Sequence, residues 1–71
     1  MIQDERLQQR KRIGQRIAEV RRQRGMTQQV LANLTGIRQS HIARIEKGTY
    51  SVGFDTLQAI AGAMDMRIDL I

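Results

Sequence analysis

The sequence predicts an all-α fold in which four to five short helices enclose one core. The chain has 71 residues, which suffices for one compact domain but not for two. Apolar residues recur at helical spacing along most of it, and six glycines separate these segments in the absence of any proline. We therefore divide the chain into a basic helical extension (1–12), a helical domain (13–64) and a strand-like tail (65–71).

The first helix is expected to begin near Asp4 or Leu7 and to end at Gln23. Three apolar residues share one of its faces at the spacing i, i+4, i+7: Ile13, Ile17 and Val20. Gly25 follows as a stop signal, and the arginines of the last turn oppose the negative end of the helix dipole.

The second helix is expected to begin after Thr27 and to end at Gly36. The Thr27 hydroxyl can accept a hydrogen bond from a free amide of the first turn, and Met26 can pack on Leu31 as a hydrophobic staple. Gly36 can adopt the left-handed conformation that ends a helix.

A third helix follows at once and ends at Gly48, so the two helices with their glycine turn form a helix-turn-helix. Arg38 stands at the cap position, where arginine is a poor cap, and we expect its side chain to contact phosphate instead. Ile42 and Ile45 lie on the apolar side of this helix. The opposite side carries Gln39, Ser40, Ala43, Arg44 and Lys47, and such a polar face can enter a DNA major groove.

The fourth helix is expected from Phe54 to Ala63, with Gly53 as its cap and Val52 as a staple against Leu57. The predicted core collects the apolar residues that share helical faces: Ile13, Ile17, Val20, Leu31, Ala32, Leu34, Ile37, Ile42, Ile45, Phe54, Leu57, Ile60 and Met64.

The tail alternates apolar and charged residues, which is the period of a β-strand. Its apolar members are Met66, Ile68 and Leu70. One protomer offers no second strand, so we expect this segment to pair with its copy in a homodimer, across a twofold axis. The alternative is a truncated helical turn that begins at Asp69 and packs on the core.

Composition limits the function. The net charge is +5, from 12 basic and 7 acidic residues, which favours a polyanionic partner. No cysteine is present, and His41 is the only histidine, so no thiolate zinc site or nucleophile and base pair can be assembled. We expect no enzyme, no cofactor and no metal. No apolar stretch is long enough to span a bilayer, and we expect a soluble cytoplasmic protein.

These residues together resemble the helix-turn-helix domain of the phage Cro and repressor family, also called the xenobiotic-response-element family. The matching elements are Ile13, Gly14, Ile17, Arg21, Gly25, Thr27, Gln28, Leu31, Ala32, Gly36, Ile37, Ile42, Arg44, Ile45, Glu46, Gly48, Thr56, Leu57, Ile60 and Ala61. The resemblance implies a lambda-repressor-like domain whose third helix docks in the major groove, and dimers that read pseudo-palindromic operators in a prokaryotic or phage setting. Departures from the pattern are Arg38, the pair Val52 and Gly53, and Asp65.

The resemblance also implies site residues. Gln39, Ser40 and Arg44 occupy base-reading positions, and their chemistry agrees, because glutamine can bond adenine bidentately and arginine can bond guanine. Residues expected to contact phosphate or position the helices are Thr27, Gln28, Arg38, Lys47, Thr49 and Tyr50, with Gln28 also bracing Gln39. Arg21 and Glu46 are expected to form an internal ion pair.

The leading interpretation is a sequence-specific regulator of transcription, acting as a repressor that binds double-stranded DNA. An antitoxin that binds a toxin protein and represses its own operon is an alternative. A peripheral membrane protein is disfavoured because the apolar face of the first helix is needed for the core. RNA binding is disfavoured because almost no aromatic residue is present for stacking on bases.

Overall fold

The first helix forms the long axis of the protein. The computed structural model describes residues 2–70, with side chains from residue 5 onward, and contains α1 (Ile2–Gln23), α2 (Gln28–Thr35), α3 (Gln39–Lys47) and α4 (Phe54–Ala63). At a rise of about 1.5 Å per residue, the 22 residues of α1 span about 33 Å, close to the longest extent of the molecule, 36 Å. α1 begins earlier than expected and continues unbroken from the predicted extension into the domain.

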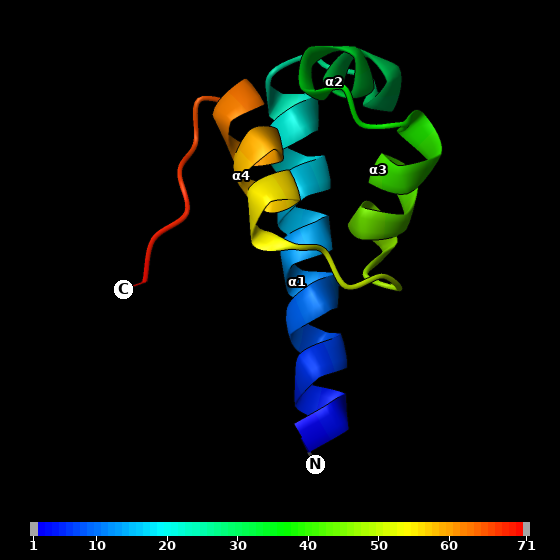
Figure 1. Cartoon of the computed structure of the whole chain (residues 1–71), viewed down its shortest axis with the longest axis vertical. Helices are drawn as coiled ribbons and strands as arrows, with labels where there is room; N and C mark the ends of the chain where they lie inside the picture. Colours follow the sequence, from blue (N-terminus) through cyan, green and yellow to red (C-terminus); the bar gives the residue numbers. More distant parts are fainter. Residues whose placement is uncertain (1, 71) are drawn as a thin grey trace.

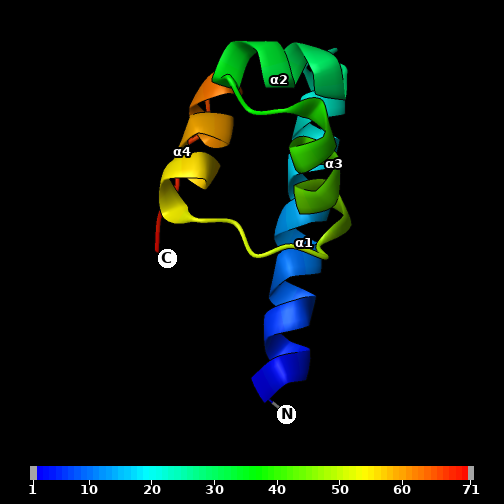
Figure 2. The ribbon, with the colours of Figure 1, turned by 45° about the vertical axis from the view of Figure 1, so that its right-hand side comes forward.

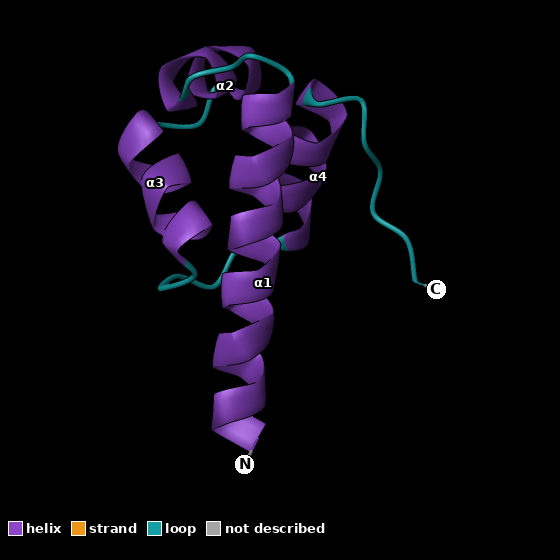
Figure 3. Cartoon of the chain, turned by 180° about the vertical axis from the view of Figure 1, so that it is seen from behind, coloured by secondary structure: helices purple, strands orange, loops and turns teal. Residues whose placement is uncertain are grey.

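The other three helices surround the C-terminal half of α1. α3 and α4 lie on either side of it, and α2 crosses at the end where α1 finishes (Figure 1 and Figure 2). α3 packs on α1, and α2 packs on both α3 and α4. The first turns of α1 project beyond the remaining helices, as the view from behind also shows (Figure 3). These four helices confirm the all-α prediction.

The helix ends follow the local signals in the sequence. Thr27 caps α2, with its side-chain oxygen accepting a hydrogen bond from the Val30 amide at 3.1 Å. Gly36 ends α2 in the left-handed conformation, with φ of 73°. Arg38 precedes α3 without a side-chain capping bond, as expected for arginine. Asp65 takes a left-handed conformation after α4, with φ of 57°.

The core lies where all four helices meet. Leu31, Ile42 and Ile60 are fully buried at its centre. The other buried members of the cluster are Ile17, Val20, Ala32, Ile45 and Met64. The two predicted staples, Met26 and Val52, are partly buried against this cluster, as is Ile37 before α3.

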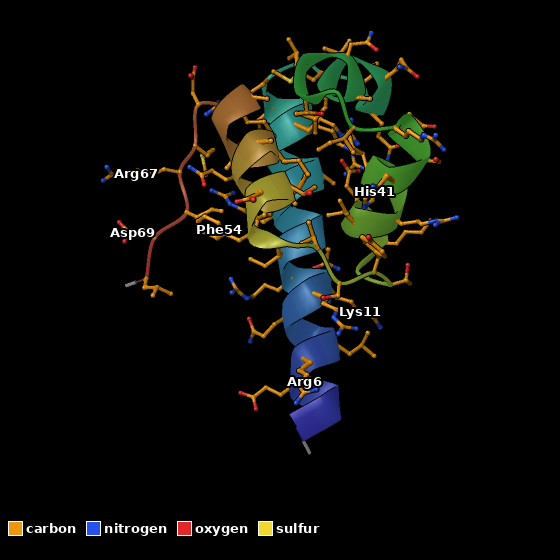
Figure 4. All side chains as sticks on the ribbon, in the orientation of Figure 1. Arg6, Lys11, His41, Phe54, Arg67 and Asp69 are labelled. Carbon is orange, nitrogen blue, oxygen red and sulfur yellow. The ribbon has the colours of Figure 1, made fainter. Side chains whose placement is uncertain are left out.

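Two predicted core residues are on the surface. Leu34 is 60% exposed because α2 buries the side that Leu31 and Ala32 share, and Leu34, two residues after Ala32, lies about 200° around the helix from Ala32. Phe54 is 63% exposed because it is the first residue of α4, at the end of the helix that lies away from α2 (Figure 4).

The tail forms neither predicted structure in the described chain. Residues 66–70 are neither helix nor strand, so the truncated helical turn at Asp69 is wrong, and pairing with a second copy stays a prediction. The Met66 amide donates to the Ala61 carbonyl at 2.8 Å, which turns the chain back beside α4. Arg67 and Asp69 point away from the helices (Figure 4). Between the tail, α1 and α4 lies an apolar groove of about 780 Å³.

Candidate nucleic-acid interface

The polar face of α3 is open to solvent along its length. Gln39, Ser40, Arg44 and Lys47 are all exposed. The opposite face is buried and consists of Ile42, Ile45 and Glu46. Since successive residues of a helix turn by about 100°, this division places the three predicted base-reading side chains together on the outer side of α3.

A buried ion pair fixes α3 to α1. Arg21 Nε donates to Glu46 Oε2 at 2.7 Å, and Arg21 Nη2 donates to Glu46 Oε1 at 3.0 Å. The two side chains are only 8% and 6% exposed. A third donor, Arg21 Nη1, reaches the Met26 carbonyl at 2.8 Å, so the guanidinium also holds the start of the α1–α2 connection. The hydrogen bond to Glu46 raises the pKa of Arg21 above its ordinary value.

A chain of hydrogen bonds leads from this ion pair to the surface. Gln28 Nε2 donates to Glu46 Oε1 at 2.9 Å, and Gln28 Oε1 accepts from Gln39 Nε2 at 2.6 Å. The Gln39 side chain is therefore positioned by its hydrogen bond to Gln28. Its carbonyl oxygen and its second N–H group are left to bond a ligand. These are the groups that a bidentate contact with adenine requires.

The predicted phosphate-contacting residues lie around this face on three segments. Thr27 precedes α2, Arg38 precedes α3, and Lys47 with Thr49 and Tyr50 stands at the end of α3; all five are exposed. Gln28 differs from them, since it is half-buried and its amide oxygen and nitrogen both bond within the protein.

Close contact between α1 and α3 depends on a glycine, Gly14, whose packing role was not predicted from the sequence. A Cβ atom built on Gly14 would lie 2.4 Å from the Ile45 carbonyl oxygen and 2.5 Å from that of Glu46. Only a hydrogen at this position lets the helices approach so closely. A glycine in the middle of a predicted helix was the available signal, because it weakens the helix unless packing requires it.

His41 lies half-buried beside this site and packs edge-on against Tyr50, with ring centroids 4.7 Å apart. Its Nε2 atom is buried and has no hydrogen-bond partner in the described structure. Among the described residues, no group of three or more potential metal ligands occurs. Within that same part of the chain, no helix is both long and apolar enough to cross a membrane.

Comparison with known proteins agrees with this geometry. The family model described as Helix-turn-helix matches residues 17–71. The chain is 37% identical, over 59 residues, to an immunity repressor protein of Bacillus phage phi105, covering 83% of this chain and 41% of the relative. It is 38% identical, over 58 residues, to an uncharacterized HTH-type transcriptional regulator, y4dL, of Sinorhizobium fredii, covering 82% of this chain and 30% of the relative. The chain thus spans less than half the length of either relative.

Proposed function

Because the chain belongs to the Cro/repressor type of helix-turn-helix DNA-binding domains, we propose that it binds double-stranded DNA sequence-specifically and regulates transcription as a repressor. The observation that carries this proposal is the exposed polar face of α3, backed by a buried ion pair and a bonded glutamine pair. A rigid support of this kind limits the entropy lost when side chains bind base edges.

In this proposal three side chains read bases. Gln39 bonds adenine through its free carbonyl oxygen and N–H, while Arg44 bonds N7 and O6 of guanine. Ser40 adapts to either a donor or an acceptor. Each bidentate contact discriminates against a wrong base by about 1–3 kcal/mol.

The surrounding residues hold the sugar-phosphate backbone. In this proposal the exposed residues Arg38, Lys47, Thr49 and Tyr50 contact phosphates, together with the helix-start amides of α2 and α3. Four such phosphates per protomer give a log-log dependence of affinity on salt with a slope of about −7 for a dimer.

The proposed assembly is a homodimer that reads a pseudo-palindromic operator. Leu70 is 96% exposed, and Met66 and Ile68 are each more than one-third exposed. A segment with alternating apolar residues suits antiparallel pairing with its own copy, in which the Leu70 amide would exchange its bond to the Asp69 side chain for one to the partner strand. Deletion of residues 66–71 should then halve the mass measured by light scattering and weaken operator binding. An unchanged mass would exclude the tail as the dimer contact.

A second candidate is an antitoxin that also binds a toxin protein. Leu34 on α2 and Phe54 at the start of α4 are the most exposed of the large apolar side chains outside the tail, at 60% and 63%, and in this role a bound toxin would cover one of them. Co-expression with the product of the adjacent gene tests this role. A complex that the change Leu34→Ser or Phe54→Ser disrupts would support it, and separate elution of the two proteins would oppose it.

Selection of bound sites from a random duplex pool tests the main proposal. We expect enrichment of one two-fold-related site. Arg44→Ala should weaken binding and relax preference at one base position, whereas Lys47→Ala should weaken all duplexes alike. Equal losses on operator and random DNA for Arg44→Ala would refute its role in base reading, and absence of any enriched site would refute the function.

A further inference from the structure

We propose that the N-terminal half of α1 binds the phosphate backbone of DNA beside the site read by α3, through Arg6, Arg10 and Lys11, here called the basic strip. This inference rests on the proposed DNA binding and extends it to a segment that lies before the part matched by the family, residues 17–71.

The basic strip lies against the loop that follows α3. A Cβ atom built on Gly48 would fall 2.6 Å from the Cα atom of Lys11, so the backbones of α1 and the end of α3 are in direct contact there. Arg6 and Arg10 line one shallow hollow with Glu5, Gln9 and Ser51, and Arg10 lines a second with Tyr50. Glu5 forms no ion pair with either arginine among the described side chains. Lys11 lies on the side of α1 that α3 occupies (Figure 4). The strip thus continues the surface formed by the end of α3 and its loop.

Among the described side chains, the charges of the basic strip form no ion pair. All three side chains are exposed, and none has a hydrogen-bond or ion-pair partner among the described side chains, residues 5–70. The cations on the tail side of α1 are held within the helix: Arg16 pairs with Glu19, and Arg12 keeps its charge but donates to the neutral amide of Gln9 at 2.9 Å. Free cations on one side of a helix attract a polyanion to that side.

The dimensions suit a duplex backbone. Arg6 and Lys11 are separated by about 7.5 Å along the helix axis, while phosphates of one strand follow each other at about 3.4 Å along the duplex axis. The strip can therefore engage about two phosphates per protomer. Since phosphates carry no sequence information, these contacts add affinity without changing the preferred bases.

A matched pair of double variants tests the inference. Arg10→Gln with Lys11→Gln removes two charges from the strip, and Arg12→Gln with Arg16→Gln removes two charges from the tail side of the same helix. Circular dichroism and light scattering first establish equal helicity and equal mass. Affinity for a duplex selected by the wild-type protein, carrying ten flanking base pairs, is then measured from 50 to 200 mM salt, with phosphate ethylation interference on the same duplex.

We expect the strip variant to lower the steepness of the salt dependence by about 1.8 per bound protomer. Its deficit against the wild type should therefore grow about tenfold for each bound protomer from 200 to 50 mM salt. Its interference signals at flanking phosphates should disappear, while the ratio of operator to random affinity stays unchanged. The tail-side variant should keep the wild-type slope and signals.

Equal changes in both variants would show that affinity depends only on net charge, and this would overturn the inference. An unchanged salt-dependence slope in the strip variant would overturn it as well. In either case the wild-type base preference would still stand, and with it the proposed function. A wild-type protein that prefers no duplex would instead overturn both.

Discussion

Removal of the Glu46 carboxylate is the sharpest test of how the recognition surface is supported. Glu46→Ala deletes both bonds to Arg21 and the bond from Gln28. The guanidinium of Arg21 then stays buried with only the Met26 carbonyl as an acceptor. The substitution also releases Gln28, which positions Gln39. One change in the interior should therefore lower both stability and discrimination between DNA sites.

The expected loss of stability follows from burial. Breaking a buried ion pair by removing one partner costs about 3–5 kcal/mol, because the remaining charge keeps its desolvation penalty. For a domain of this size, each kcal/mol lowers the melting temperature by about 4–8 °C. We therefore expect Glu46→Ala to melt at least about 12 °C below the wild type.

The protein supplies its own control on α1, the helix that carries Arg21. Glu19 pairs with Arg16 at the surface, where the two side chains are 58% and 55% exposed. Because exposed pairs contribute about 0–1 kcal/mol, Glu19→Ala should shift the melting temperature by only a few degrees. Thermal and urea unfolding followed by circular dichroism measure both variants. A loss below about 1 kcal/mol for Glu46→Ala, or equal losses for the two variants, would refute the reasoning.

The contribution of the ion pair to the free energy of unfolding should also persist at alkaline pH. The pKa of Arg21 is raised in the folded state by its hydrogen bond to Glu46. A raised pKa contributes stability that is complete below the ordinary arginine value and is lost only when the pH rises past the folded value. The difference in unfolding free energy between wild type and Glu46→Ala should therefore stay constant from pH 7 to 10. A difference that falls steadily over this interval would contradict the assignment of the bond.

Three further predictions concern packing and site geometry. Gly14→Ala should destabilise the protein by about 1–3 kcal/mol, because the new Cβ would collide with the Ile45 carbonyl. Gly62→Ala in α4, where the space around the residue is open, should instead stabilise the protein by about 0.5–1 kcal/mol. Urea titrations in which both variants changed stability in the same direction would be inconsistent with this reasoning. Thr27→Ala should cost about 1 kcal/mol in the same titrations through loss of the α2 cap, and a neutral result would show that the bond to the Val30 amide contributes nothing. Gln28→Ala should weaken discrimination only at the base that Gln39 reads, which competition between operator variants measures; a uniform loss at every base would argue against the bracing role.

Local signals in the sequence were sufficient for the helix ends from Gln23 onward, although α1 begins earlier than expected. Caps and glycine turns act within a single turn of helix, so Thr27, Gly36 and Gly48 could be placed without knowledge of the rest of the chain. The division of α3 into a polar and an apolar face was also predictable, because it depends only on helical period. In the fold as a whole, four helices and their order were thus available from the sequence.

Which residues are covered was decided by tertiary structure. Leu34 and Phe54 have large apolar side chains like those of core residues, but no other helix covers them, and both are exposed. The tail has the pattern of a strand, but a strand requires a partner for its backbone groups, and one described chain offers none. The sequence fixes what each side chain can do within its own helix. Contact between helices makes glycine necessary at position 14 and links Arg21 to Gln39 through Glu46 and Gln28. These contacts join residues far apart in the chain, so local sequence patterns do not determine them.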